Sequence, residues 1–276
     1  MTSTTPHDAA PRDVYTHGHH ESVLRSHTWR TVENSAAYLV PHLRDGLDVL
    51  DLGSGPGTIT VDLARRVRPG RVIGVDASAE IVAQANGLAA SSAVDNVEFR
   101  VGDAYALDFD DDTFDVVHAH QTLQHLQHPV DALRELRRVL RPGGVLAVRD
   151  VDYGGVLTAP ASDALTRWLE LYHAVHAWNG GEPDAGRHLK AWVREAGFTD
   201  VTSSGSVWVF ASDAEREWWG QSWALRATES QFAVHAIESG HSNADELQRI
   251  SDGWLAWAAD ADGWMLMPHG EVIARG

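Results

Sequence analysis

Residues 49–57 read VLDLGSGPG, an apolar run that passes directly into three glycines within five positions. The apolar run predicts a short buried strand. Glycines let the backbone turn sharply and let a ligand approach closely, because they carry no side chain. The third glycine comes one residue earlier than in the dinucleotide fingerprint G-x-G-x-x-G, with Pro56 before it, so a nicotinamide cofactor is disfavoured. On this stretch alone, an ordinary tight turn from strand to helix is the alternative.

Strand and helix patterns alternate on both sides of the glycine stretch. Short segments, most of them rich in Val, Leu and Ile, predict strands at residues 48–52, 71–75, 97–101, 114–118 and 144–148. Helical patterns lie between them at residues 58–67, 79–89 and 129–140, the last ended by Arg-Pro-Gly-Gly at 141–144. This alternation predicts a mostly parallel sheet covered on both faces, which is a doubly wound α/β fold.

The regular alternation of strand and helix patterns ends after Asp150. Apolar spacing predicts one helix through residues 165–175 and another through 189–193, followed by a strand at 201–210. A largely helical stretch then runs from 213 to about 259, and residues 264–267 with 270–274 predict a closing β-hairpin. No clean linker divides the chain, so the helical parts are interpreted as insertions on one domain.

These patterns give four expected regions. Residues 1–14 form a flexible tail and residues 15–45 form N-terminal helices. Residues 46–150 form the core, and residues 151–276 complete the sheet with a helical cap at about 155–196 and 213–261. Nine aromatic residues of the later region suit a flat or apolar ligand, or the cap's own core: Tyr153, Trp168, Tyr172, Trp178, Trp208, Trp218, Trp219, Trp223 and Phe232.

Composition excludes several classes of function. The chain has no cysteine, which rules out disulfides, thiolate metal sites and a cysteine nucleophile. A net charge of -17 without any basic run disfavours nucleic acid and anionic membranes as partners. The first residues lack the basic start and apolar stretch of a signal peptide, so a cytoplasmic location is expected.

Acidic residues accompany three of the predicted strands. Asp51 lies within the first, Asp76 ends the second, and Asp103 follows the third. A carboxylate at the position of Asp76 can accept hydrogen bonds from both hydroxyls of a ribose and would repel a 2′-phosphate. Because ligands of open α/β folds bind at the carboxyl edge of the sheet, these acids predict an adenosine site there.

Five ordered motifs extend the pattern over residues 34 to 150: VLDLGSGPG, VIGVDAS, VEFRVGDA, FDVVHAHQTLQHLQHP and ELRRVLRPGG. Together they resemble class I S-adenosylmethionine-dependent methyltransferases, especially the branch of ubiquinone and menaquinone biosynthesis. The resemblance implies a Rossmann-like, seven-stranded sheet and S-adenosylmethionine as cofactor, with S-adenosylhomocysteine as product. It also implies a small-molecule methyl acceptor and no metal.

The resemblance also implies roles for individual residues. Asp51 with Gly53, Ser54 and Gly55 would hold the methionine part, and Asp76 the ribose. Ala77 would lie beside the adenine, and Asp103 with Ala104 would read its edge. His120 and Gln121 would flank the sulfonium. The N-terminal segment would fold over the cofactor as a lid, with Tyr15 and Arg30 among its contacts.

Histidines are the candidates for a general base, which a hydroxyl acceptor usually needs. His120 and His125 follow the fourth predicted strand, with His118 and His128 nearby, and His17 lies in the histidine-rich stretch YTHGHHESVLRSH at 15–27. Each has a structural alternative as a hydrogen-bonded residue. A metal site is disfavoured because the place after the fourth strand holds His-Ala-His-Gln rather than carboxylates.

Three other functions stay open on the sequence. The chain could be an oxidoreductase with an adenosine cofactor, a protein that binds the cofactor without transferring a methyl group, or a repurposed enzyme that uses the sulfonium only for electrostatics.

Overall fold

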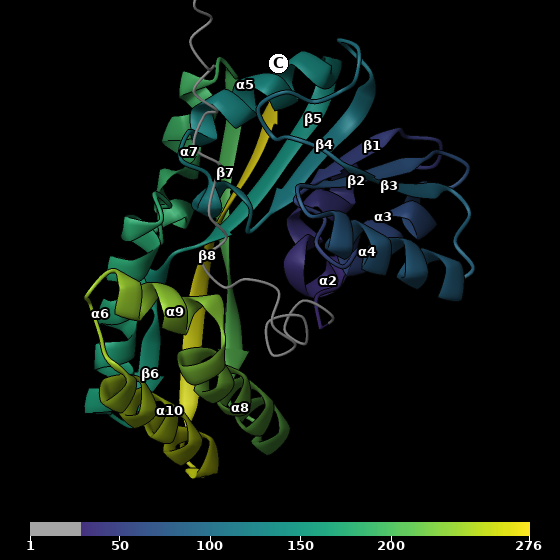
Figure 1. Ribbon diagram of the computed structural model, residues 1–276. Coiled ribbons are helices and arrows are strands. Elements are labelled where there is room, and N and C mark those ends of the chain that lie inside the picture. Colours follow the sequence, from purple (N-terminus) through teal and green to yellow (C-terminus); the bar gives the residue numbers. More distant parts are fainter. Residues whose placement is uncertain (1–28) are drawn as a thin grey trace, which may run out of the picture.

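A single mixed sheet runs through the molecule. The computed structural model describes residues 29–276 (Figure 1). Within them eight strands are ordered β3-β2-β1-β4-β5-β8-β6, with β7 paired to β8. The strands are β1 (Val49–Leu52), β2 (Val72–Asp76), β3 (Val97–Val101), β4 (Phe114–His120), β5 (Leu140–Val151), β6 (Leu157–Ala159), β7 (Asp200–Phe210) and β8 (Trp264–Arg275).

The first five strands are parallel, and β8 runs antiparallel to β5, β6 and β7. The carboxyl ends of the five parallel strands therefore meet at one edge of the sheet, and the order of the strands reverses between β1 and β4. A crevice at such a reversal is where open α/β sheets bind ligands. The predicted doubly wound α/β fold is confirmed, with eight strands because the short β6 was not expected.

Helices cover both faces of the sheet. On one face α2 (Val32–Ser35), η1 (Ala37–His42), α3 (Thr58–Val67) and α4 (Ala79–Ser91) share an apolar core with β1 and β2. On the other face α5 (Pro129–Val139) and α7 (Ala185–Glu195) pack with η2 (Leu123–His125). The start of α4 is set by Ser78, whose hydroxyl accepts from the Ile81 N–H, and α5 starts with Pro129.

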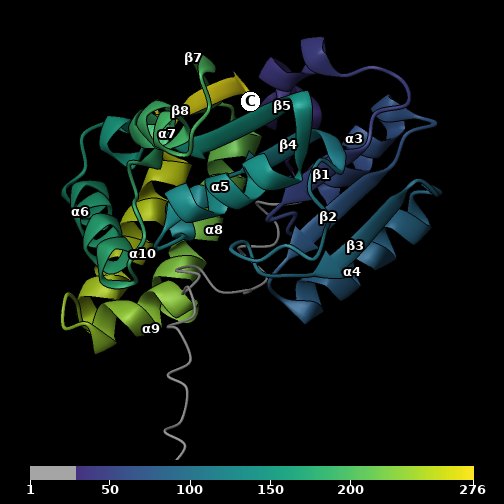
Figure 2. The same ribbon diagram turned by 90° about the horizontal axis from the view of Figure 1, so that it is seen from above.

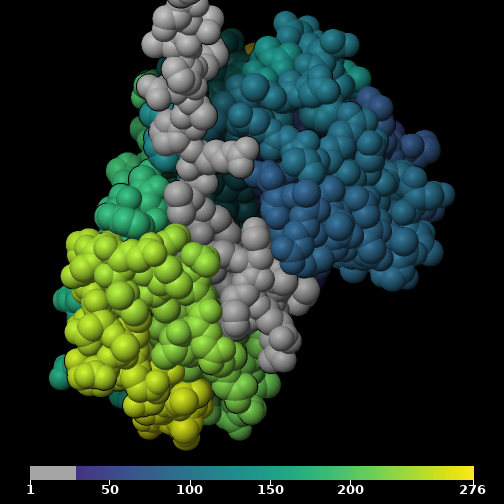
Figure 3. All heavy atoms as spheres, viewed as in Figure 1, coloured from purple at the N-terminus to yellow at the C-terminus, as the bar shows by residue number. Residues whose placement is uncertain are grey.

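Four further helices surround one end of the long strand β8, away from α3 and α4, as Figures 1 and 2 both show. They are α6 (Asp163–Trp178), α8 (Asp213–Glu229), α9 (Gln231–Glu238) and α10 (Ala244–Ala259), and we call them the cap. Figure 3 shows the surface of α9 and α10 in yellow-green to yellow at the lower left, and the blue surface of the first strands and helices at the right. The short helix η3 (Tyr153–Gly155) connects β5 to β6.

Tryptophan rings make the centre of the cap. Trp168, Trp223 and Trp254 are fully buried, and the ring of Trp168 meets the other two edge-on at 4.6 and 4.8 Å. Edge-to-face contacts at these distances add to the free energy of burial. Most of the aromatic residues predicted for the cap therefore stabilise the cap itself.

The end of the chain differs from prediction. Residues 264–275 form the single strand β8 instead of a hairpin. The predicted hairpin placed a turn at residues 268–269, but β8 pairs with β7 along its length and with β5 through its second half. Gly270 lies so close to the backbone of Gly186 in α7 that a Cβ atom would overlap it. The glycine thus marks close packing.

Other bounds shift by a few residues. The helical stretch after 213 is three helices, and β4 continues two residues further than predicted, to His120. Strand β5 begins at Leu140, directly after α5. No helix within residues 29–276 combines the length and apolarity needed to cross a membrane.

Candidate active site

The turn between β1 and α3, which we call the glycine turn, has three positions that suit only glycine. Gly53, Gly55 and Gly57 all have positive φ, of 69°, 54° and 88°. A Cβ atom on Gly53 would also overlap the side chain of Thr122. The N–H groups of Gly53 and Ser54 both donate to the Val75 carbonyl, at 2.8 and 3.1 Å, which fixes the turn to β2. The turn therefore presents open backbone at the edge of the sheet.

Asp76 is fastened beside this turn. Its Oδ2 accepts from the Gly55 N–H at 3.0 Å and its Oδ1 from the Ser78 N–H at 3.0 Å. These bonds hold the carboxylate in one orientation, and each oxygen keeps a second lone pair for a ligand hydroxyl.

Asp51 is buried more deeply than Asp76. Its Oδ1 lies 2.7 Å from Nδ1 of His118, and its Oδ2 accepts from the Thr60 hydroxyl at 2.5 Å. Both Asp51 and His118 are buried. His118 is therefore a partner of Asp51, whereas sequence reasoning had grouped it with the candidate bases.

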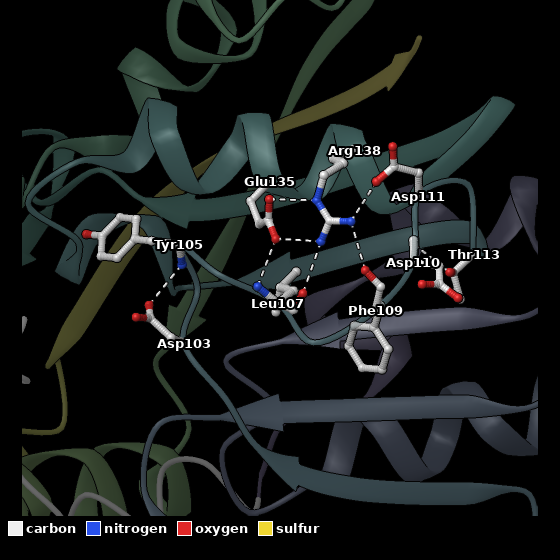
Figure 4. Close-up of polar contacts among 9 residues, drawn as sticks. All are labelled: Asp103, Tyr105, Leu107, Phe109, Asp110, Asp111, Thr113, Glu135 and Arg138. Carbon is white, nitrogen blue, oxygen red and sulfur yellow. Dashed lines mark hydrogen bonds and ion pairs between the residues drawn. The ribbon is translucent and has the colours of Figure 1, made fainter.

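Asp103 and Ala104 follow β3 in a loop that is tied to α5 (Figure 4). Oδ1 of Asp103 accepts from the Tyr105 N–H at 2.9 Å. Further along, Arg138 donates to the carbonyls of Leu107 and Phe109, and Glu135 accepts from the Leu107 N–H. The loop is therefore held in place at the sheet edge.

One cavity of about 350 Å³ runs along this edge and under the cap. Of the residues predicted to bind the cofactor, ten line it: Arg30, Asp51, Gly53, Ser54, Gly55, Asp76, Ala77, Ala104, His120 and Gln121. Both neighbours of Asp103 line it, but Asp103 itself does not. Predicted Tyr15 and His17 lie outside the described residues.

The far part of the cavity is formed by later elements. Tyr153, Trp208 and Trp219 line it, as do Arg226 of α8 and Met267 of β8. Three of the nine aromatic residues singled out from the sequence therefore reach the cavity. The cavity joins the predicted cofactor residues to an aromatic wall.

His120 stands between these two parts. It is 5% exposed, and neither ring nitrogen has a hydrogen-bond partner within residues 29–276. Burial, with the charges of Arg149 and Arg30 adding to it, holds the pKa of His120 well below its usual range. The imidazole is therefore neutral at pH 7 and offers one acceptor and one donor.

His125 also lines the cavity, on η2. Its Nε2 lies 3.0 Å from Nε2 of Gln124, so the amide must donate and Nε2 of His125 must accept. Burial and the neighbouring His176 keep the pKa of His125 well below its usual range. His128, the other nearby histidine, is exposed and does not line the cavity.

Gln121 connects three distant segments. Its backbone is left-handed, with φ of 51°, and its Oε1 accepts from Nη2 of Arg30 at 2.7 Å. Its Nε2 lies 2.8 Å from Nε2 of His269 in β8. Because the amide nitrogen can only donate, His269 accepts through Nε2, and its Nδ1–H donates to the Met267 carbonyl at 3.1 Å. Burial and the charge of Arg149 keep the pKa of His269 low, in agreement with this neutral form.

Sequence reasoning missed several buried polar residues around the site. They are Arg149, Arg226, His269 and Glu271. Arg149 lies in β5, with its guanidinium 4.9 Å from the Trp208 ring and its Nε 3.4 Å from a Glu271 oxygen. None of the four belongs to a local motif, and β8 had been predicted as a hairpin, so no signal in the sequence singled them out. Of the four, Arg226 lines the cavity.

Within the described part of the chain, no three His, Asp or Glu side chains are grouped as ligands for a metal ion.

The chain is similar in sequence to known methyltransferases. The sequence model of a family described as "Methyltransferase domain" matches residues 43–197. An uncharacterized methyltransferase of Schizosaccharomyces pombe is 32% identical over 269 residues, which cover 95% of this chain and 96% of that protein. A ubiquinone/menaquinone biosynthesis C-methyltransferase of Hahella chejuensis is 40% identical over 132 residues, 47% of this chain and 51% of that protein.

Among solved structures, the YcgJ protein of Bacillus subtilis has the same fold. Its TM-score is 0.57 at 21% identity, over 87% of this chain and 97% of that one. The family match spans more than half of the chain, and the Schizosaccharomyces pombe relative is similar over nearly all of it. This chain is therefore an enzyme of the S-adenosylmethionine-dependent methyltransferase family.

Proposed function

We propose that this enzyme methylates a hydroxyl group of a small, flat, aromatic metabolite. The observation that carries the proposal is that one continuous cavity joins the glycine turn and Asp76 to an aromatic wall, with a buried, neutral His120 in its lining. A cavity that ended at the turn would suit a protein that binds the cofactor without transferring its methyl group.

The residues at the sheet edge fit the cofactor that the family uses. Ser54 of the turn lines the cavity, and its buried hydroxyl oxygen has no hydrogen-bond partner within residues 29–276, so it is available to a ligand there. When bound, S-adenosylmethionine supplies a methyl group on a positively charged sulfur. Asp76 would accept hydrogen bonds from the ribose hydroxyls, with Ala77 and Ala104 beside the adenine.

The methionine part would lie over the glycine turn. Asp51 keeps one lone pair on each oxygen after its bonds to His118 and Thr60, so it can accept from an ammonium group directly or through water. Arg30, already fixed to Gln121, would pair with the carboxylate. In these assignments Asp51 faces the positively charged ammonium group of the cofactor, and Arg30 faces its negatively charged carboxylate.

His120 would act on the acceptor. A hydroxyl becomes a strong nucleophile when its proton is removed, and a neutral imidazole takes up that proton as the oxygen attacks the methyl carbon. The rings of Trp208 and Trp219 would hold the acceptor flat, which supplies the in-line geometry of the displacement.

The ribose assignment predicts a measurable loss of affinity. Asp76→Ala should weaken binding of S-adenosylhomocysteine by about tenfold or more, because two hydrogen bonds to a charged carboxylate are removed. Isothermal titration calorimetry measures the change. Asp262→Ala is the matched control, since Asp262 is exposed and does not line the cavity. Equal affinities for the two variants would refute the role of Asp76.

Methyl transfer itself is tested with labelled cofactor. The protein should transfer the label to members of a panel of phenols, naphthols and quinone-like acceptors, as read by mass spectrometry. Tight binding of S-adenosylhomocysteine with no labelled product from any acceptor would favour a binding protein over an enzyme acting on this class.

A further inference from the structure

We propose that the acceptor carries a second hydroxyl group and that Gln124 binds it. The side-chain oxygen of Gln124 accepts a hydrogen bond from this second hydroxyl, while His120 takes the proton of the first. This inference rests on the proposed function and narrows its substrate class to dihydroxy aromatic molecules. None of the roles that the sequence motifs imply falls on Gln124.

Gln124 is a buried residue of the cavity wall with one unused acceptor atom. It lies in η2, lines the cavity and is only 2% exposed. Its Oε1 is buried and has no hydrogen-bond partner within residues 29–276. Buried polar atoms of native proteins are nearly always hydrogen-bonded, and a neutral amide oxygen can only accept. Its place at the wall of a ligand cavity therefore points to a ligand that donates.

The other polar groups of Gln124 are bonded to the protein. Its Nε2 donates to Nε2 of His125 at 3.0 Å, and its backbone N–H donates to Oδ1 of Asp150 at 3.4 Å. Its backbone carbonyl accepts from the Glu182 N–H at 2.8 Å and from Nε2 of His176 at 2.8 Å. These bonds hold Oε1 in one orientation before a ligand arrives, which lowers the entropic cost of binding.

The donor groups of the cofactor already have acceptors at the glycine turn. In the proposed arrangement Asp51 faces the ammonium group and Asp76 faces the ribose hydroxyls. Gln124 is instead bonded to His176 of the cap helix α6 and to Glu182 beyond it, where the core meets the cap. Its Oε1 is therefore left for a donor of the methyl acceptor.

A neutral hydroxyl is the donor that suits this place. Burial, His176 and the charge of Arg30 all lower the pKa of the neighbouring His125. Surroundings that disfavour a protonated imidazole also disfavour an ammonium group, whereas a hydroxyl donates without carrying a charge. His120 and Gln124 are four residues apart and both line the cavity. One hydroxyl at each of them fixes the ring of the acceptor at two points.

Equilibrium binding tests this inference without turnover. The protein is saturated with S-adenosylhomocysteine and titrated calorimetrically with the isomeric benzenediols and naphthalenediols, each paired with the compound in which fluorine replaces one hydroxyl. Fluorine is similar in size to a hydroxyl but cannot donate, so it leaves Oε1 buried without a partner. For at least one isomer the diol should bind about tenfold more tightly, a preference of about 1.4 kcal/mol.

Gln124→Leu removes the acceptor oxygen with little change in volume. It should reduce the preference for the diol to less than about threefold while leaving the affinity for S-adenosylhomocysteine unchanged. Gln124→Glu keeps a side-chain oxygen that accepts and should retain the preference. The matched control is Gln221→Leu, because Gln221 is exposed and does not line the cavity. It should keep the full preference.

The outcomes separate this inference from the proposed function. Diols that bind in preference but are never methylated would support the role of Gln124 and contradict the proposed reaction. Methylation of the fluorinated phenols, with no preference for the diols in binding, would do the opposite. If neither member of any pair binds the wild-type protein, or if Gln124→Leu keeps the preference, the second hydroxyl site is wrong. If Gln124→Leu weakens S-adenosylhomocysteine and leaves the preference intact, Gln124 serves the cofactor instead.

Discussion

Replacing His120 by glutamine should lower kcat on a hydroxyl acceptor by about a hundredfold or more, because general bases contribute roughly 10² to 10⁴ in rate. Glutamine keeps a hydrogen-bonding side chain of similar size but cannot take up a proton. The affinity for S-adenosylhomocysteine should change little, since the imidazole faces the acceptor in the proposed arrangement. Turnover with labelled cofactor and calorimetry measure the two effects.

The pH dependence of this reaction follows from burial. Because the pKa of His120 is held well below 6.5, the imidazole is already neutral at pH 6, and kcat/KM should stay constant from about pH 6 to 8. His128→Gln is the matched control, as His128 is exposed and directly precedes α5. Full turnover in His120→Gln would contradict the role of His120 as base. A wild-type rate that rises steeply through pH 6.5 would contradict its lowered pKa.

The free energy of unfolding should rise steeply as pH increases from 5 to 6.5. Burial lowers the pKa of four histidines below the usual value: His120, His125, His176 and His269. Below pH 6.5 the unfolded chain binds protons at these residues and the native protein does not, so stability present above pH 6.5 is lost as pH falls. For His176 the window extends down to its native pKa of about 4.

One buried acid acts in the opposite direction. Burial raises the pKa of Asp150 to about 8, so the native protein keeps a proton that the unfolded chain releases above pH 4. Its contribution to stability therefore decreases as pH rises from 4 to 8. Because four histidines act against one aspartate, the free energy of unfolding should still rise with pH below 6.5.

Denaturant titrations at several pH values measure this slope. His176→Gln should reduce it by about 1.4 kcal/mol per pH unit, because the amide can still donate to the Gln124 carbonyl but binds no proton. His241→Gln, at an exposed position, should leave the slope as it is. A slope unchanged by His176→Gln would mean that His176 is protonated in the native protein.

Sequence patterns predicted those parts of the site that are determined by short stretches of the chain. A glycine turn between a strand and a helix, and an acid at the end of the next strand, each lie within a few residues, and parallel topology brings them to one edge. Gly53 and Asp76 were predicted for this reason, and both line the cavity. Their roles toward a cofactor stay predictions until binding is measured.

The other half of the cavity depends on contacts between distant segments. His269 reaches Gln121 only because β8 pairs with β5, and Arg226 reaches the cavity only because α8 packs in the cap. The predicted hairpin placed its turn at residues 268–269, and the local propensities of Pro268 and its neighbours favour one there. Pairing of β8 with strands on both sides, and the close approach of Gly186, outweighed those propensities.

The place of β8 in the sheet also sets an order of assembly during synthesis. All strands of the parallel part and the glycine turn lie before residue 152, whereas β8 supplies Met267 and His269 more than a hundred residues later. At about 5 to 20 residues per second, this interval lasts on the order of ten seconds on the ribosome. The parallel strands and the glycine turn, which form one end of the cavity, are therefore synthesised before the strand that supplies Met267 at its other end.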